Sequence, residues 1–447
     1  MPSRSRFALA WCLALCWAWS SAWAADADLE RMAKEPLTEE QWREVSARRG
    51  SDPAFMARAY RLGCVQRLER GELAPTPANL ESVRLGLTLA QQLASKSDVA
   101  GLLLCRGRLN QGGDQSKKAE ADFSLALQEA AAANESGLQA LALALRGELQ
   151  EAQGNLSAAQ RDLLAAQRVG PPPHDYAVMA LATFYNDSRI GSHADALALL
   201  QALMARLEAG PPSHRLSAAR FETGLALQHL GRNPEALAAL VQAQAGFEAL
   251  KDAVRAARSQ AHRAQVLLRL QQPVEALTLS TEALRAAALD DQVQFVAGMV
   301  RVGALRQLGK LEEAEALLGQ LRQRIGSEPG PAVQAQLQEE AAELAAAAKR
   351  WELAFRARTE ELEQVQALTA LQKESQTQRL KLDLESARLV AESERRLAET
   401  SAALQLRRWQ WALLALALAS AMGLAWCALR FARQTRARQS AGSDGAQ

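Results

Sequence analysis

One turn between two helices recurs through most of this chain. In residues 221–243, two helical patterns meet at Gly231. Glycine can adopt the left-handed conformation that ends a helix, and Pro234 is tolerated in the first turn of the next helix. The small residues Gly224 and Ala236 lie seven before and five after the turn, where they would let two helices approach to roughly 8–10 Å. The stretch therefore predicts an antiparallel helical hairpin.

The same hairpin occurs seven times, at intervals of 37 to 40 residues. The turn residues are Asp114, Gly154, Gly191, Gly231, Gln271, Gly309 and Lys349. An alanine follows each turn by five residues: Ala119, Ala159, Ala196, Ala236, Ala276, Ala314 and Ala354. The residue seven before each turn is mostly small: Gly107, Gly147, Phe184, Gly224, Ala264, Val302 and Ala342. Seven hairpins in one register predict an all-α fold, an α-solenoid.

In these residues the chain resembles the tetratricopeptide repeat family, over residues 99–362. The period is longer than the roughly 34 residues of that family, and most of the family's aromatic positions are Leu or Ala here. The resemblance implies a solenoid of slightly longer helices. It also implies a protein or peptide ligand in the groove of the solenoid.

The composition argues against a nucleic-acid binder. Half of the residues are hydrophobic (49%), and the net charge is only +2. A nucleic-acid-binding domain would be clearly basic. We also expect no enzyme activity, no cofactor and no metal, because the five histidines are scattered without a second ligand at metal spacing.

Residues 1–24 have the pattern of a secretory signal peptide. Arg4 and Arg6 precede an apolar run over 7–19, and Ala22-Trp23-Ala24 is a small-x-small cleavage site. The alternative is an uncleaved membrane anchor, for which the run is short. Residues 25–98 are expected to form a lead-in and capping helices, among them a hairpin from 53–69 and 80–95.

Two cysteines remain in the exported part, Cys64 and Cys105, on the first helices of successive hairpins. In an oxidising compartment they could form a disulfide. The alternative, two separate buried thiols, is left open by the sequence.

A long charged helix is predicted after the last turn. No Pro or Gly occurs between Trp351 and Arg408, and residues 363–408 are rich in Glu, Gln, Arg, Leu and Ala. A heptad seam contains Leu368, Leu371, Leu382, Leu389, Ala403 and Leu406, but also Ser375, Gln378, Glu385, Glu392, Arg396 and Glu399. The seam is half polar, so the helix could form a coiled coil or could be a single helix folded back on the array.

Residues 409–429 carry no charge and are long enough for one transmembrane helix. Ala415, Ala419 and Gly423 form a small-xxx-small face suited to helix pairing, which suggests a homodimer through the long helix and this segment. Residues 430–447 form a short basic tail. With the signal peptide, this predicts a single-pass protein of a bacterial inner membrane, with the repeats in the periplasm and the C-terminus in the cytoplasm.

The groove of the solenoid is the expected binding surface for a protein. In the register of the turns its exposed positions are Arg108, Gln111, Glu148, Glu151, Tyr185, Ser188, Gln228, Gln265 and Arg306. Some members of the family hold a peptide carboxylate with a Lys/Asn clamp. That clamp is absent here, where its positions are Leu104, Arg108, Ala144, Glu148, Leu181 and Tyr185.

The whole arrangement also resembles the periplasmic sensory half of bacterial membrane receptors of the diguanylate cyclase or histidine kinase type, without the cytoplasmic output domain. We therefore expect a membrane-anchored periplasmic protein–protein interaction module. It could be a receptor or signalling component that acts with a separate partner. The alternative is an assembly or structural factor for envelope protein complexes.

Overall fold

The computed structural model describes residues 28–32, 39–111, 115–169, 174–187, 189–287, 290–325 and 330–443. These residues form helices joined by short turns, without a strand among them. The predicted signal peptide (1–24) and the end of the basic tail (444–447) lie outside the described residues.

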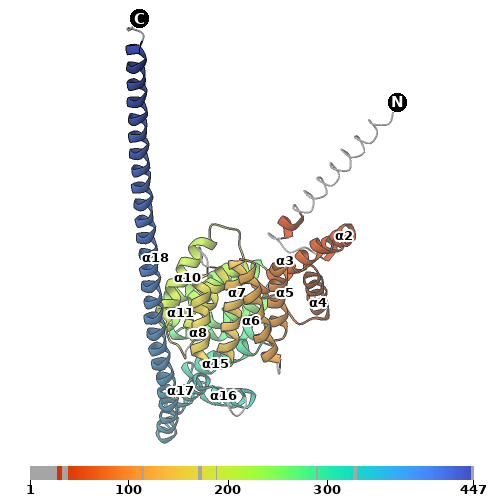
Figure 1. Cartoon of the computed structure of the whole chain (residues 1–447). Coiled ribbons are helices and arrows are strands. Elements are labelled where there is room, and N and C mark those ends of the chain that lie inside the picture. The colour runs from red at the N-terminus through yellow and green to blue at the C-terminus, as the bar shows by residue number, and fades with distance from the viewer. Residues whose placement is uncertain are drawn as a thin grey trace, which may run out of the picture. The chain divides into compact units, whose positions relative to one another are not determined.

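A short helical stretch at 28–32 and the helices α2 (Glu39–Arg49), α3 (Pro53–Glu69) and α4 (Pro77–Gln92) precede the regular hairpins. The first helices of the seven hairpins are α5 (Lys96–Leu109), α7 (Ser136–Ala152), α9 (Asp175–Asn186), α11 (His214–His229), α13 (Ala253–Arg269), α15 (Asp291–Gln307) and α17 (Pro331–Ala347). The second helices are α6 (Ser116–Ala132), α8 (Leu156–Arg168), α10 (His193–Leu207), α12 (Asn233–Ala249), α14 (Pro273–Ala286), α16 (Leu311–Ile325) and α18 (Trp351–Ser443). Figure 1 shows α5, α6, α7 and α8 stacked in chain order. The all-α solenoid is confirmed.

The register of the turns is also confirmed. Six of the seven turn residues have positive φ, between 57° and 80°: Gly154, Gly191, Gly231, Gln271, Gly309 and Lys349. At the third of these the amide of Arg232 donates to the carbonyl of Leu227 at 2.9 Å, which satisfies a carbonyl left free at the end of α11. Asp114 lies outside the described residues. Proline opens several of the helices, as Pro234 does in α12.

The small residues around each turn allow the close approach that the sequence predicts. Six of the repeated alanines are completely buried, whereas Ala354 in the last hairpin is only half-buried. A Cβ added to Gly107 would lie 2.5 Å from the ring of Phe123, and one added to Gly224 would lie 2.6 Å from Leu240. Contacts this short leave no room for a side chain, so glycine sets the spacing within these hairpins.

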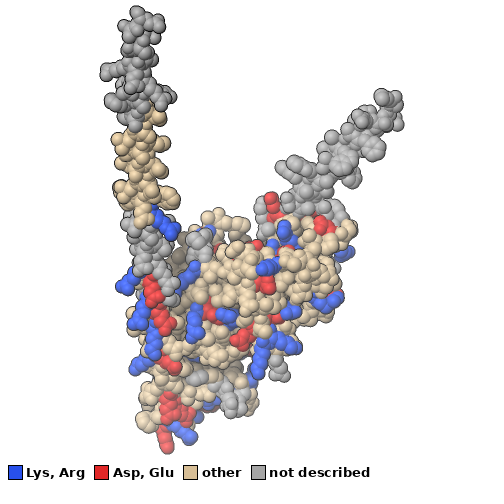
Figure 2. All heavy atoms as spheres, viewed as in Figure 1, with Lys and Arg blue, Asp and Glu red and all other residues tan. Residues whose placement is uncertain are grey.

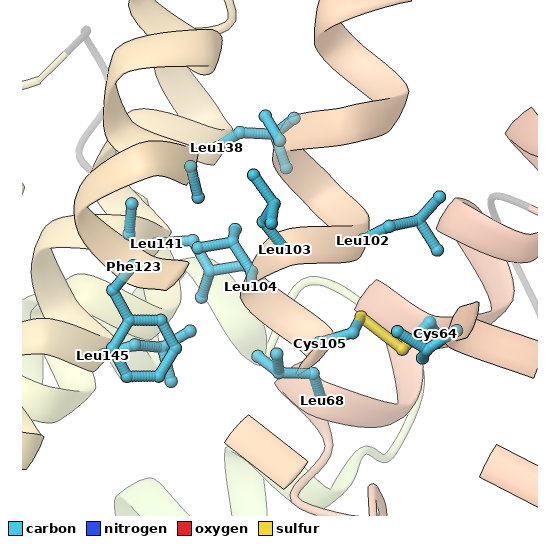
Figure 3. Packing of buried hydrophobic residues seen from close by; sticks show 14 of the residues in the cluster. Cys64, Leu68, Leu102, Leu103, Leu104, Cys105, Phe123, Leu138, Leu141 and Leu145 are labelled. Atoms are coloured by element: carbon cyan, nitrogen blue, oxygen red, sulfur yellow. A yellow bond between two sulfur atoms is a disulfide. The ribbon is translucent and has the colours of Figure 1, made fainter. Parts of the chain in front are cut away.

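Cys64 in α3 and Cys105 in α5 are joined by a disulfide, with their Cα atoms 6.3 Å apart. Both cysteines are buried in a cluster of leucines that α3, α5 and α7 share (Figure 3). The disulfide ties the capping helices to the first regular hairpin.

Helix α18 is continuous from Trp351 to Ser443. The domain boundaries expected at 408 and 429 fall within this one helix, because the composition changes there without a Gly or Pro that would end it. The chain divides into two compact units, residues 1–378 and 379–447, so that α18 begins in the first unit and forms the described part of the second.

Within the first unit, α18 folds back on the array. Leu371 and Ser375 line a cavity together with Asn155 at the start of α8, and Ser375 is only 8% exposed. Gln372 lies close to Gly191. A Cβ added to Gly191 would be 2.7 Å from Gln372 Nε2. The first part of the expected heptad seam therefore faces the array of the same chain, which the sequence analysis had offered as the alternative.

Within the described residues, one stretch, Trp409–Trp426, is long and apolar enough to cross a membrane. The described side chains of this stretch are exposed. Figure 2 shows it as a band of α18 without Lys, Arg, Asp or Glu.

Candidate binding pocket on the inner face of the array

A pocket of about 250 Å³ lies where the first helices of several hairpins converge. The end of α3 contributes to it together with α5, α7, α9, α11 and α13. Met179, Ala180 and Ala218 provide apolar lining, whereas Thr183 adds a hydroxyl. The helices α5, α7, α9, α11 and α13 are the first helices of five consecutive hairpins. The pocket therefore lies on the face expected to form the groove.

Two carboxylates of α7 line one part of the pocket. The hydroxyl of Tyr176 donates to Glu148 Oε2 at 3.0 Å, and Arg108 Nη1 lies 3.6 Å from the same carboxylate. Burial raises the pKa of Glu148 despite the nearby Arg108. Burial, followed by the negative charge of Glu148, also raises the pKa of Tyr176 well above its ordinary value. The tyrosine therefore remains a hydrogen-bond donor at neutral pH.

The negative charge of Glu151 is only weakly compensated by nearby cations. Its nearest cation is Arg189, with Nη2 at 3.8 Å from Oε1, and Arg189 also pairs with Asp187 at 2.8 Å. Burial and the charge of Asp187 raise the pKa of Glu151 to about 7, against the opposing effect of Arg189. Near neutral pH this carboxyl is therefore divided between its neutral and its ionised form.

Cationic residues line another part of the pocket, at the beginnings of α11 and α13. Arg215 pairs with Glu69 at 3.2 Å and with Asp175 at 3.7 Å. Arg255 pairs with Asp252 at 2.8 Å, in an i,i+3 arrangement. The pocket thus presents carboxylates on α7 and guanidinium groups on α11 and α13, which suits a polar ligand with both signs of charge.

Polar groups continue along the inner face beyond the pocket. Asn186 Nδ2 donates to the carbonyl of Glu222 at 3.0 Å and to its Oε2 at 2.9 Å. Burial raises the pKa of Glu222. The pKa of His262 is lowered to about 4, chiefly by burial, although Gln265 lies 3.2 Å from its Nδ1. These groups reach α13, so the inner face is polar over several hairpins.

The structure brings three of the nine predicted groove residues into the pocket: Arg108, Glu148 and Glu151. Gln111 accepts a hydrogen bond from Arg108 at 2.5 Å, and Gln265 lies beside His262. Arg306 pairs with Glu340 of α17 at 3.2 Å, beyond the pocket.

Two of the predicted groove residues are not exposed, which corrects the sequence analysis. Tyr185 is 3% exposed and packs in the core beside Phe184, because its aromatic ring fills space between hairpins. Gln228 is 4% exposed, and its backbone carbonyl accepts from Arg269 at 3.0 Å. Ser188 lies outside the described residues.

Several pocket residues were missed, among them Tyr176, Thr183, Arg215 and Arg255. Tyr176, Arg215 and Arg255 lie in the first turn of their helices, and Thr183 lies eight residues before Gly191. The predicted positions were all taken three or six residues before a turn. The pocket uses the ends of α5 and α7 but the beginnings of α11 and α13. A spacing of three to four residues along α9, from Tyr176 through Met179 to Thr183, was the available signal.

No group of His, Cys, Asp and Glu that could hold a metal ion occurs in the described part of the chain. The exposed charges are mixed. Lys and Arg are interspersed with Asp and Glu on the face of the array seen in Figure 2.

Comparison with known proteins gives similarity of fold only. No protein-family model matches the chain, and no curated protein matches it. Among solved structures, a Rap protein complexed with competence and sporulation factor matches at 15% identity and a TM-score of 0.47, covering 71% of this chain and 88% of that one. PilW, a widely conserved type IV pilus biogenesis factor, matches at 16% identity and 0.42, covering 54% and 97%. A tetratricopeptide repeat protein from Parabacteroides merdae matches at 18% identity and 0.42, covering 62% and 98%. At these scores the repeat assignment rests on the hairpins of the chain itself.

Proposed function

We propose that this chain is a membrane-anchored protein–protein interaction module whose repeats lie in the periplasm. The observation that carries the proposal is the pocket on the inner face of the first helices, with the carboxylates of Glu148 and Glu151 and the guanidinium groups of Arg215 and Arg255. Such a surface can hold a polar segment of another protein through side-chain and backbone groups of that segment. The partner would be a separate protein, and the chain would act as a receptor or signalling component with it.

Helix α18 supports the anchoring. It continues from the last hairpin into Trp409–Trp426 without a break, so no flexible linker would separate the repeats from the membrane. The pattern of a signal peptide in residues 1–24 supports export of the repeats across a bacterial inner membrane, with the C-terminus in the cytoplasm.

A homodimer through the second unit belongs to this proposal. Since Leu371 and Ser375 face the array of their own chain, pairing would be confined to residues 379–423. Leu382 and Leu389 lie in the seam, and Gly423 lies in the apolar segment.

A second candidate function is an assembly or structural factor for envelope complexes. Trp351 and Phe355 at the start of α18 are 67% and 76% exposed, on the last hairpin of the array. They lie four residues apart and so share one face of the helix. An exposed aromatic pair of this kind suits a stable contact with another protein.

Site-specific photo-crosslinking in cells can distinguish these surfaces. A photoreactive residue at Thr183 probes the pocket, one at Phe355 probes the exposed start of α18, and one at Gln201, exposed on α10, is the control. The main proposal predicts a discrete protein adduct at Thr183 and none at Gln201. An adduct at Phe355 alone would favour the assembly factor, and equal labelling at all three positions would contradict both.

A further inference from the structure

The end of α3 closes the array on itself. Residues 68–71 line the pocket, together with the beginnings of α11 and α13. The contact joins Glu69 to Arg215, which is 146 positions away in the sequence. No other part of the capping helices lines this pocket among the described residues.

Contacts of Glu69, Arg70 and Glu72 hold the end of α3 in place. Glu69 Oε2 lies 3.2 Å from Arg215 Nη2, and Glu69 Oε1 lies 3.3 Å from His174 Nε2. Glu72 Oε1 lies 3.7 Å from His214 Nδ1. The guanidinium of Arg255 donates to the carbonyl of Arg70 at 3.4 Å.

The backbone at Gly71 is shaped for this contact. Its φ is 70°, a left-handed conformation that ends α3. A Cβ at this position would lie 2.5 Å from Arg255 Nη2, so a side chain would displace the guanidinium. The ionised form of Glu69 is favoured, since the hydrogen bond from His174 and the charge of Arg215 outweigh the effect of burial and lower its pKa.

All of these contacts are polar and partly exposed. The side chains of Glu69 and Arg215 are 24% and 23% exposed. Breaking an ion pair between such largely buried side chains is costly only while a charge stays unpaired. A charged segment of a partner can therefore take over these pairs, whereas it cannot replace the leucine core around Cys64.

We propose that residues 69–72 form a latch that covers one side of the pocket and must be displaced before a partner segment can enter. The role of the latch in binding rests on the proposed function, but the latch itself does not. The disulfide at Cys64 fixes α3 five residues before Glu69, so the latch moves about an anchored point.

Thiol accessibility tests the latch without any partner. Ala218 lines the pocket on α11 and is half-buried, so a cysteine there reports whether the pocket is covered. The Ala218→Cys change is made in the full chain with Cys427→Ser, and its rate of reaction with a maleimide is measured. Glu69→Arg, which sets like charges against Arg215, should raise the rate about tenfold, equivalent to about 1.4 kcal/mol of opening free energy.

Charge exchange and two control positions make the result specific. Glu69→Arg combined with Arg215→Glu restores an ion pair and should return the rate close to that of the parent. A cysteine at the exposed Gln201 should react equally in all backgrounds, and one at the fully buried Ala236 should stay unreactive unless the array unfolds. An unchanged rate in Glu69→Arg, or no recovery in the double variant, would overturn the latch.

Crosslinking from Thr183 separates the latch from the proposed function. If both hold, Glu69→Arg increases the protein adduct at Thr183 and the double variant restores the parental yield. Latch-dependent thiol rates without any protein adduct would leave the latch standing and contradict the binding function. An adduct at Thr183 with the same yield in the parent and in the latch variants would support the binding function and contradict the latch.

Discussion

Ala236 shows how one small side chain sets the distance between two helices. It is completely buried in α12, and the carbonyl of the same residue would lie 3.5 Å from a Cβ added to Gly224 of α11. The sequence predicted this contact from the position of both residues relative to Gly231. The same relation recurs between α7 and α8, where the carbonyl of Ala159 would lie 3.2 Å from a Cβ added to Gly147.

Replacing Ala236 with Phe should destabilise the array by about 1–3 kcal/mol, because the larger side chain overpacks the contact between α11 and α12. The measurement is urea unfolding of the detergent-solubilised chain, followed by circular dichroism. Ala238→Phe, at an exposed position on the same helix, is the matched control and should leave the midpoint almost unchanged. Equal midpoints for the two variants would contradict the packing at Ala236.

Glu151→Gln should stabilise the protein at pH 8 but not at pH 4. The pKa of Glu151 is about 7 in the folded protein against an ordinary value of 4.5. Its protonated form is thus favoured by folding, and the penalty on the ionised form grows as the pH rises from about 4.5 to about 7. Glutamine resembles the protonated carboxyl, so the gain in free energy of unfolding at pH 8 should be roughly 1–3 kcal/mol.

Unfolding curves of Glu151→Gln and the wild-type chain at both pH values measure this difference. Glu129→Gln on α6, where the carboxyl is half-exposed and lies outside the pocket, is the control for replacing a carboxylate by an amide. A stabilisation of Glu151→Gln that is the same at pH 4 and pH 8 would show that burial does not govern this carboxyl.

At the scale of single elements, the helices and their ends were more predictable than the elements against which each helix packs. Gly, Pro and a buried alanine are local signals, and they located the turns of α11–α12 and its neighbours. The packing of α3 against α11 has no local signal, because its ion pair joins residues that are 146 positions apart. Likewise, the half-polar seam around Leu371 left two partners open, because such a seam can face the array or a second copy.

The disulfide between α3 and α5 should contribute to stability. It encloses about 40 residues, for which the loop-closure entropy predicts roughly 3–4 kcal/mol, less any strain. Cys64→Ser with Cys105→Ser should lower the free energy of unfolding accordingly. In the denatured, unreduced protein, thiol labelling should reach Cys427 but neither Cys64 nor Cys105, and labelling of all three would show that the bond does not form.

At the scale of the whole molecule, composition and repeat spacing predicted the order of its parts. The array is followed by the long helix α18, which contains the apolar stretch, and the turns in the array fix its hairpins. The candidate site was less predictable, because the pocket is lined by the ends of some first helices and by the beginnings of others. Arg108, Glu148 and Glu151 were found by counting from the turns, whereas Arg215 and Arg255 could not be found in this way.

The central claim is that α18 holds a protein-binding array on the outer side of a bacterial inner membrane. Reporter fusions in cells test it most directly. Alkaline phosphatase fused after Gly330 should be active, because the array would be exported, and a fusion after Gln447 should be inactive, because it would follow the stretch Trp409–Trp426 into the cytoplasm. The opposite pattern of activities, or equal activity of both fusions, would contradict the account.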